Sequence, residues 1–580
     1  MYAGDMAHFH VKKKKGRPYL YVREIARVQG KPKVVNQIYI GSPDRVAALV
    51  TGEGKSNVKQ LRVEEFGSLW AANRMDSDVD LAGIVDDVIP RVSNETGPTV
   101  GEYFLYCVLN RMVNARSKRA LPDWYSKTAI QQIRPVDIGE LTSQRYWDKW
   151  DRVDEGALDK IGRQFFEKIW ELENPDADCL LFDTTNYYTF MASDTKSELA
   201  QRGKNKAGRH SLRQVGLGLL VARQSRLPLY YRVYPGNTHD SRLFHDVLDE
   251  MFGVVCGLNR TKERLTVVID KGMNAEGNYT WIDEHKRVHF VTTYSTYFAQ
   301  ELALTPLEQF EPLDLERNRR LKAKGKEADC LVAFRTKGQY WGKARAVVVT
   351  HNPVTARKQN YTLDAKLETL RTELLQMRSK VRDSTPQWRK AEPIRERYLG
   401  LCERMHLPSD LYAIDLTTTE GKLSMSIRKD AYQVQRRRAS FGRNIIITDN
   451  TDWTTSEIVQ ASLDRWQVEE RFRQSNDDDL VNTIPIRHWT DSKIRCHLFT
   501  CVVAMTHLRR LELRLRAAGM KLTATGAIEE LRCLHSVLTI GDGRSKPERR
   551  IETPTKTQAE VLKALGAKID DGGVLRLAVA

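Results

Sequence analysis

The chain has 580 residues, too many for one hydrophobic core, and we expect three or four structural units. Lysine and arginine number 92 against 75 aspartates and glutamates, and the resulting net charge of +17 favours a polyanionic partner. No apolar run approaches the roughly 20 residues that a membrane-spanning helix needs, and no apolar stretch near the start resembles a secretion signal. The eight cysteines form no CxxC pair, which indicates small core residues in a reducing compartment. We therefore expect a cytoplasmic protein that binds nucleic acid and no membrane.

The first two units differ in the spacing of their apolar residues. Residues 9–41 alternate in the manner of strands and are broken twice by glycine and proline, which predicts a three-stranded β-meander in a unit spanning 1–50. Between 51 and 175 the spacing becomes helical, as in "VGEYFLYCVLNRMV", and predicts a helical domain.

The segment 176–297 changes pattern again and predicts an α/β unit. Three strands are expected first, then a helix, a strand, a short helix and a fifth strand, and the sequences behind them are "CLLFD", "VGLGLLVA", "LPLYYRVY", "DSRLFHDVLDEMFGVV", "RLTVVID", "NAEGNYTWIDEH" and "RVHFVTTY". This order is that of an RNase H-like sheet, in which three antiparallel strands are followed by parallel crossovers.

Two of these expected strands end in aspartate, at Asp183 and Asp270. In the predicted order the two strands are neighbours, so both carboxylates meet at one edge of the sheet, where ligand sites of open α/β sheets lie. Two adjacent carboxylates repel each other unless a divalent cation lies between them, and Mg²⁺ prefers oxygen ligands. The alternative, that each aspartate only caps the turn after its strand, remains open.

Residues 298–452 predict an inserted domain with β-rich and helical parts. Apolar residues recur there at alternating spacings of four and three, which indicates a coiled-coil seam, at Leu363, Leu367, Leu370, Leu374, Met377 and Val381. A second short seam follows Pro386, so the two helices predict an antiparallel hairpin. Tyr340 and Trp341 in this insertion are candidates for stacking on an unpaired base, with a place in the core as the alternative.

The segment 453–515 predicts the return of the chain to the α/β core, followed by a C-terminal helical region, 516–580. Arg465, Glu469 and Asn476 share one stripe of a helix expected from about 455 to 476. Glu469 on that stripe is able to join the two aspartates as a third ligand, although an i, i+4 Arg-Glu pair is ordinarily a surface ion pair.

The loop 202–213, "RGKNKAGRHSLR", is basic and rich in glycine, and it lies between the first two core strands. Its cations are candidate phosphate contacts, at Lys204, Lys206, Arg209 and Arg213. A solvated loop without a ligand is the alternative.

Four ordered segments, "LLFDTTNYY", the stretch from "GKNKAGRHSLRQVGLGLL" to "YPGNTHDSRLF", "VVIDKGMNAEGN" and "RWQVEERFRQ", resemble the DDE transposases of bacterial and archaeal insertion sequences. The resemblance runs from about 179 to 510 and is greatest to the branch with a β-rich insertion before the catalytic glutamate. It implies that Asp183, Asp270 and Glu469 form the metal-binding and catalytic triad. Within the Tyr-Arg-Glu-Lys signature of that branch, Arg465 and Glu469 match, whereas Ser462 replaces tyrosine and Asn476 replaces lysine.

The resemblance further implies an enzyme that uses two Mg²⁺ or Mn²⁺ ions for phosphodiester hydrolysis and strand transfer. Its partners would be double-stranded DNA, as transposon ends and as target, and a second copy of the chain in a synaptic homodimer. The helical domain and the insertion would hold DNA, with Arg465 and Asn476 as further contacts, in a prokaryotic, nucleoid-associated setting. The rival hypotheses are a nuclease on the same fold and a DNA-binding protein whose catalysis has decayed.

Overall fold

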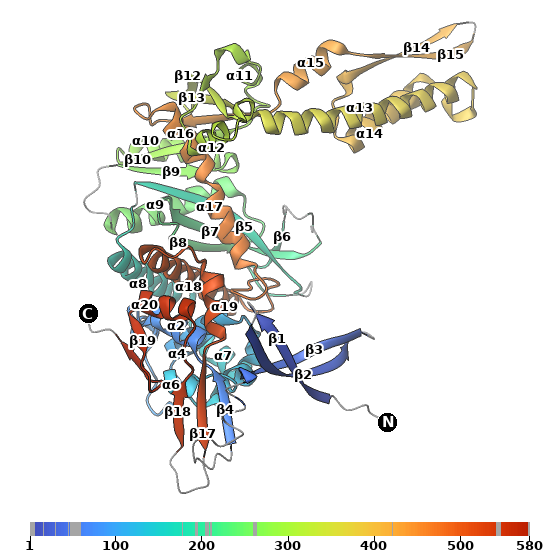
Figure 1. Ribbon diagram of the computed structural model, residues 1–580. Coiled ribbons are helices and arrows are strands. Elements are labelled where there is room, and N and C mark those ends of the chain that lie inside the picture. The colour runs from blue at the N-terminus through green and yellow to red at the C-terminus, as the bar shows by residue number, and fades with distance from the viewer. Residues whose placement is uncertain are drawn as a thin grey trace.

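The structure is a computed structural model. The molecule is elongated and of mixed α/β type, with a large sheet across its middle (Figure 1). The structure describes residues 6–14, 17–28, 31–43, 46, 60–176, 178–191, 195–203, 208, 211–258, 264–419, 421–540 and 547–577. A helical region lies at one end of this sheet, and a long helical arm extends from the other. No described helix combines the length and apolar character that crossing a membrane requires.

The central sheet has ten strands and mixes parallel with antiparallel pairing. Its strands are β5 (Cys179–Thr189), β6 (Gln201–Arg202), β7 (Arg213–Ala222), β8 (Pro228–Pro235), β9 (Leu265–Ile269), β10 (Val288–Tyr294), β11 (Glu311–Pro312), β12 (Val332–Tyr340), β13 (Lys343–His351) and β16 (Arg443–Thr448). β5, β9 and β10 run parallel as neighbours, β7 and β8 continue antiparallel from β5, and β16, β13 and β12 continue antiparallel from β10. The five core strands expected from the sequence are present in the expected chain order.

Helices cover both faces of this sheet. They are α8 (Glu155–Glu173), α9 (Asp240–Leu258), α10 (Glu276–Glu284), α16 (Thr455–Asp464), α17 (Trp466–Ser475) and α18 (Asp491–Ala517). Side chains alternate between the two faces of each strand. On β5, Leu181 joins the core with α17 and α18, whereas Leu180 and Phe182 join the core with α9 and α10. Because both faces are buried, the strand reads as a continuous apolar run.

The helical region below the sheet is built around α4, a helix that is buried almost all round. It comprises α2 (Gly67–Ser77), α3 (Leu81–Val88), α4 (Val100–Val113), α5 (Leu121–Tyr125), α6 (Ile130–Ile133) and α7 (Ser143–Trp150). Thr99 and Glu102 form a capping box that fixes the start of α4. α18 packs on α4, so this region and the central sheet share one continuous core.

The two ends of the chain contribute small sheets. The meander consists of β1 (Met6–Lys14), β2 (Arg17–Val28) and β3 (Lys31–Gly41), as the alternation predicts. The C-terminal region consists of α19 (Ala524–Arg532), β17 (His535–Ile540), β18 (Glu548–Ile551), α20 (Lys556–Ala564), β19 (Ala567–Ile569) and β20 (Leu575–Leu577).

The sequence predicted a helical region over 516–580, but the strands β17 to β20 lie there beside the helices α19 and α20. β17 pairs with β4 (Gln60–Glu65), a strand that precedes the helical region by sequence. The partner strand lies so far away along the chain that no local pattern in 516–580 points to it.

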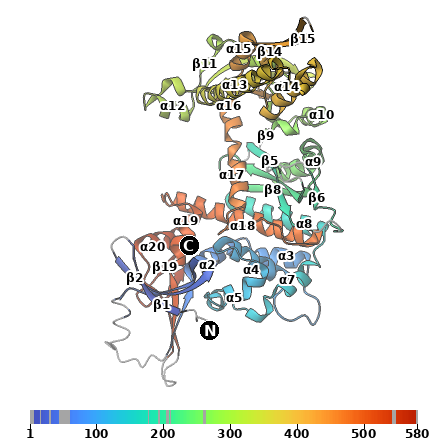
Figure 2. The ribbon, with the colours of Figure 1, turned by 90° about the vertical axis from the view of Figure 1, so that its right-hand side faces the viewer.

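The insertion divides between the sheet and an outer arm. Its strands β12, β13 and β16 extend the central sheet, whereas the sequence predicted a separate inserted unit for these residues. The outer arm, residues 353–439, projects from the sheet edge (Figures 1 and 2). Its elements are α13 (Pro353–Arg382), α14 (Ala391–Met405), β14 (Tyr412–Thr419), β15 (Lys422–Lys429) and α15 (Ala431–Ala439). All six residues of the predicted seam on α13 are buried, and they pack against α14 in a core of their own. Two short helices, α11 (Gln300–Ala303) and α12 (Glu316–Lys322), precede the arm.

Candidate active site

Asp183 and Asp270 lie side by side on neighbouring parallel strands. The parallel pairing of β5 with β9 brings Leu181 opposite Val268, and each aspartate follows two residues further on. The sequence predicted that the first strand ends at Asp183, but β5 continues to Thr189 because β7 pairs with it along this whole stretch. Asp183 therefore lies in mid-strand with only 3% of its surface exposed, and it is held more rigidly than a residue at a strand end.

Arg465 joins the two aspartates to Glu469. It lies at the junction between α16 and α17, where α17 packs against β5. Its Nη1 is 3.0 Å from Oδ2 of Asp183, and its Nη2 is 3.7 Å from Oδ1 of Asp270 and 3.2 Å from Oε1 of Glu469. One guanidinium thus contacts three carboxylates that come from three distant parts of the chain. The Arg465–Glu469 pair is not an isolated surface ion pair.

Hydroxyl and amide groups orient the two aspartates. The backbone N–H of Thr184 donates to Oδ1 of Asp183 at 2.8 Å, and Oγ1 of Thr293 donates to Oδ1 of Asp270 at 3.1 Å. The Thr184 hydroxyl in turn donates to Asp240 at 3.0 Å, where α9 begins. Hydrogen bonds of this kind hold carboxylates in one orientation and reduce the freedom of the site.

A cavity of about 510 Å³ opens in front of Asp270, Arg465 and Glu469. Its remaining lining residues are Lys271, Thr293, Tyr294, Ser295, Thr296, Arg443, Asn444, Ser462, Leu463 and Trp466. Sequence reasoning missed Lys271, Thr293 and Arg443. Lys271 could have been found from its place directly after Asp270, but Arg443 reaches the cavity only through the pairing of β16 with β10.

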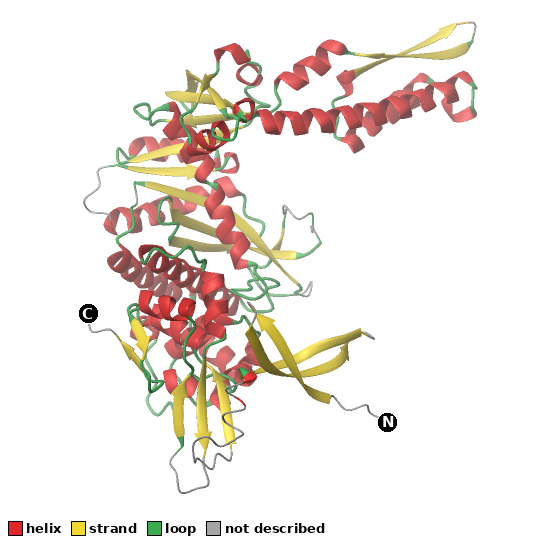
Figure 3. Cartoon of the chain, in the orientation of Figure 1, coloured by secondary structure: helices red, strands yellow, loops and turns green. Residues whose placement is uncertain are grey.

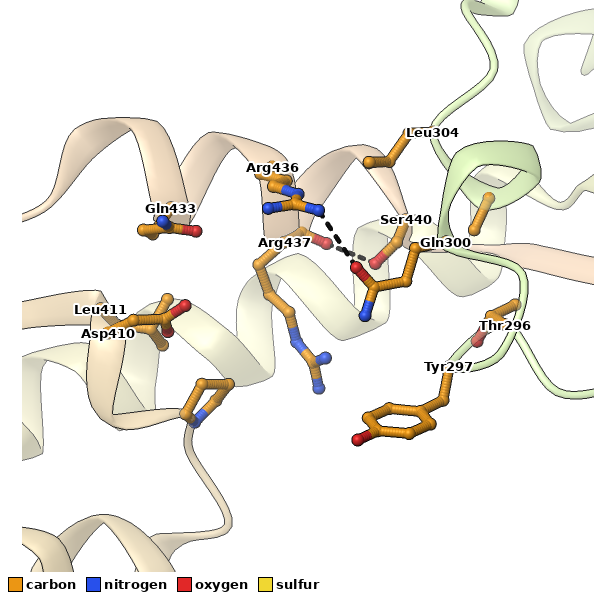
Figure 4. Close-up of a pocket in the computed structure, with 12 residues that line it drawn as sticks. Thr296, Tyr297, Gln300, Leu304, Asp410, Leu411, Gln433, Arg436, Arg437 and Ser440 are labelled. Carbon is orange, nitrogen blue, oxygen red and sulfur yellow. Dashed lines mark hydrogen bonds between the residues drawn. The ribbon is translucent and has the colours of Figure 1, made fainter.

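A second cavity, of about 380 Å³, adjoins the first, and Thr296 lines both. It lies between α15 of the outer arm and the segment after β10 (Figure 4). Arg436 donates to Oε1 of Gln300 at 3.1 Å, and Arg437 extends towards Tyr297, whose ring is 74% exposed. The wall of this second cavity therefore combines two arginines and one tyrosine with an acid, Asp410, and with apolar and neutral polar side chains.

The other predicted contacts are distributed unevenly around this site. Lys204, Lys206 and Arg209 lie outside the described residues. Arg213 begins β7 and donates to the carbonyl of Ala200 at 2.9 Å. Asn476 is exposed at the C-terminal end of α17 and does not line the cavity.

The predicted stacking residues of the insertion are packed against other rings. Trp341 stacks on Tyr279, with ring centroids 3.6 Å apart and planes 16° apart. Tyr340 meets the ring of Tyr294 edge-on at 5.2 Å. One face of Trp341 is thus already covered, as the alternative of a core position predicts.

The donor set of the acidic cluster consists of carboxylate oxygens, the ligands that hard divalent cations prefer. Among the residues that the structure describes, no three His, Cys, Asp or Glu side chains are spaced to hold a metal ion as they stand. The guanidinium of Arg465 lies between them and supplies the positive charge. These oxygen donors fit a divalent cation in kind, and the half-exposed side chain of Glu469 is the least buried of the three.

Two aspartates and a later glutamate thus lie together on one mixed sheet. The family described as "Transposase DDE domain" matches residues 175–505, more than half of the chain and a range that contains all three acids. The protein belongs to this family, whose members generally use divalent metal ions.

A solved structure similar to this chain is the cryo-EM structure of a piggyBac transposase synaptic complex with hairpin DNA. The similarity covers 82% of each chain, with 9% sequence identity and a TM-score of 0.36. No curated protein matches the chain.

Proposed function

We propose that the protein is a cut-and-paste DNA transposase of an insertion sequence. It would bind the terminal inverted repeats of its element, cleave the DNA strands there and join the freed 3′ ends to target DNA. Membership in the transposase DDE family supports this function, and so does the net charge of +17.

The observation that carries the proposal is the contact of one guanidinium, that of Arg465, with Asp183, Asp270 and Glu469. These acids are far apart by sequence, and like charges do not gather at one point unless a cation compensates them. Their convergence favours the hypothesis of a cation-binding cluster. It speaks against the alternative, in which each acid only caps its own turn.

The proposed chemistry assigns a role to each acid. Mg²⁺ or Mn²⁺ ions, two per site, would activate a water or a 3′-hydroxyl and stabilise the leaving oxygen of an in-line displacement. Asp183, buried and hydrogen-bonded, would fix the position of the site. Asp270 and Glu469 line the cavity and would face the incoming phosphodiester, and the half-exposed Glu469 would complete the site on binding.

The fold that we propose for the core is RNase H-like. The order of strands and helices from β5 to β10, with three antiparallel strands before two parallel ones, favours it. Within this fold, the insertion between β10 and α16 would bring the second cavity, with Arg436 and Arg437, next to the reacting phosphate.

DNA would be held by distributed phosphate contacts. The candidates are the basic loop with Lys204, Lys206, Arg209 and Arg213, the cations of the two cavities, and the helical domain. Synapsis of two DNA ends needs two active sites, so we propose a homodimer. The setting would be the prokaryotic cytoplasm, associated with the nucleoid.

The test is an in vitro reaction of purified protein with Mg²⁺ or Mn²⁺ and a duplex that carries the inverted ends flanking the gene in its source DNA. Products joined to a target plasmid are expected. Cut ends without joined products would support a nuclease, and a gel shift without any cleavage would support a DNA-binding protein.

The second candidate, a decayed transposase that only binds DNA, is favoured by one observation. Ser462 and Asn476 replace the tyrosine and lysine of the family signature. The persistence of all three acids in one cluster weighs against it.

A further inference from the structure

Asn476, which occupies the position of the signature lysine, does not line the cavity. Asn476 ends α17 and is exposed, and the cavity lining includes Ser462 but not Asn476. Cations from other elements face the same space instead. Besides Arg465, which the acids engage, they are Lys271 and Arg443.

Arg443 is a half-buried cation without a carboxylate partner among the described residues. Its Nη2 donates to the carbonyl of Thr305 at 2.9 Å, its Nε to that of Ala439 at 3.4 Å, and its guanidinium lies 4.2 Å from the ring centroid of Phe310. Its buried Nη1 has no hydrogen-bond partner in the part of the chain that is described. Burial also lowers the pKa of Arg443, because the surroundings solvate its charge poorly.

Two other buried arginines of this protein are neutralised by acids, whereas the buried Arg111 contacts backbone carbonyls and His497. Arg345 lies 2.6 Å from Asp283, and Arg510 lies 2.7 Å from Glu173. A buried cation that lacks such a partner costs stability, and it creates a positive potential in the space that it lines. An anion that enters the cavity therefore compensates the charge of Arg443, which lines it.

The backbone before Arg443 fixes where β16 begins, and the Arg443 side chain lines both this cavity and a separate cavity that Thr305 and Ala439 also line. Gly442 has φ +71° and turns the chain from α15 into β16. A Cβ at this position would lie 2.5 Å from the carbonyl oxygen of Asn352, so the close approach requires glycine. Arg443 is thereby fixed at the start of β16, an interior strand between β13 and β10.

Lys271 also lines the cavity and directly follows Asp270 in the chain. Its backbone N–H donates to Oγ1 of Thr293 at 3.2 Å, the same hydroxyl that orients Asp270. Its side chain is exposed and forms no ion pair with any described residue. A free ammonium at this point is available to a phosphate that approaches Asp270.

We propose that Lys271 and Arg443 are the phosphate-positioning residues of this site. They take over the role of the signature lysine, whose position is occupied by Asn476 in this chain. Their ligand is the phosphodiester backbone of the DNA strand on either side of the reacting bond. The inference rests on the proposed function, since it assigns a DNA strand to this cavity.

The test compares Lys271→Gln and Arg443→Gln with matched controls. Lys568→Gln removes an exposed lysine of β19 in the C-terminal region, and Arg532→Gln removes a half-buried arginine of α19 that donates to the carbonyl of Val113 away from the cavity. The probes are a fluorescent duplex with the element's end, for binding by anisotropy across a salt series, and the same duplex with Mn²⁺ for single-turnover cleavage.

Each cavity variant is expected to cut about tenfold more slowly than its control, the loss typical of one charge-assisted contact. The slope of log K against log salt should decrease by about one for each phosphate contact removed. Arg443→Lys keeps a charge and should recover most of the binding lost in Arg443→Gln. This recovery separates a phosphate contact from a folding defect.

The inference is overturned if the two cavity variants bind and cut like their controls. It is also overturned if Asn476→Lys restores cleavage to Lys271→Gln, because a lysine at 476 would then reach the phosphate. If wild-type protein cuts no DNA, the proposed function fails separately, and the salt slopes alone decide whether Lys271 and Arg443 bind phosphate.

Discussion

The central sheet and the outer arm both bury apolar side chains on regular periods, but they are assembled from the sequence in different ways. The core of the arm draws on one continuous segment, from Leu363 to Val434. The two cores of the sheet combine residues from Phe66 to Ala567. The arm is therefore a local unit, whereas the site on the sheet exists only when distant segments have met. Substitutions in the two regions should differ in how far their effects spread.

The largest effect is expected from the acids on the sheet. Asp183→Asn, Asp270→Asn and Glu469→Gln should each reduce cleavage at least ~10²-fold, because each removes a charged ligand from the proposed cation site. DNA binding, which depends on distributed phosphate contacts, should change little. Single-turnover cleavage and anisotropy on the same duplex measure the two quantities. If one variant still cuts at the wild-type rate, the acid that it replaces is not a ligand of the proposed cation site.

A core substitution in the arm should have a large but local effect. Leu370 is fully buried in the seam of α13, and Leu370→Ala should destabilise the arm by about 2–5 kcal/mol. Hydrogen exchange should accelerate across residues 353–439 and remain unchanged in β5 and β9. Leu375→Ala on the exposed side of the same helix is the control, since Leu375 is 39% exposed. Faster exchange throughout the central sheet would show that the arm is not a separate cooperative unit.

Arg465→Gln tests how the acidic cluster is compensated. Without the guanidinium, the three carboxylates repel one another, and the metal-free protein should lose about 1–3 kcal/mol of stability. The half-exposed Glu469 keeps this loss below that of a fully buried pair. Mn²⁺ should bind more tightly to the variant, because a competing cation has been removed.

Thermal unfolding with and without Mn²⁺, together with titration calorimetry, measures both effects of Arg465→Gln. Arg473→Gln is the matched control, since Arg473 is exposed on the same helix. Equal Mn²⁺ affinity in wild type and Arg465→Gln would contradict competition between the guanidinium and the cation.

The same contrast explains how much the sequence could predict. The seam of α13 is local, and spacings of four and three identify all six of its buried residues. The neighbouring positions of Asp183 and Asp270 followed from strand order, because consecutive elements limit the possible sheets. The central place of Arg465 could not be predicted, since its i, i+4 spacing to Glu469 is equally typical of a surface pair.

Non-local pairing accounts for the remaining differences. β16 continues the central sheet beyond β10, and β17 pairs with β4, although long stretches of sequence separate each pair. A strand reveals its period locally but not its partner. For this reason the place of Arg443 at the cavity, which depends on β16, could not be predicted from the sequence. That of Lys271 could be, because Lys271 directly follows Asp270.

The smallest effect is expected from an ion pair at the surface of the arm, where Arg438 contacts Asp364. The two groups form a simple ion pair, and the Arg438 and Asp364 side chains are 36% and 54% exposed. Water screens such a contact, so Asp364→Asn should change the free energy of unfolding by only about 0–1 kcal/mol, and less at high salt. Denaturant unfolding at two salt concentrations measures the change. If Asp364→Asn lowers the free energy of unfolding as much as Arg465→Gln does, then exposure does not determine how much an ion pair contributes. The stability of the arm would then depend on charge as much as that of the site does.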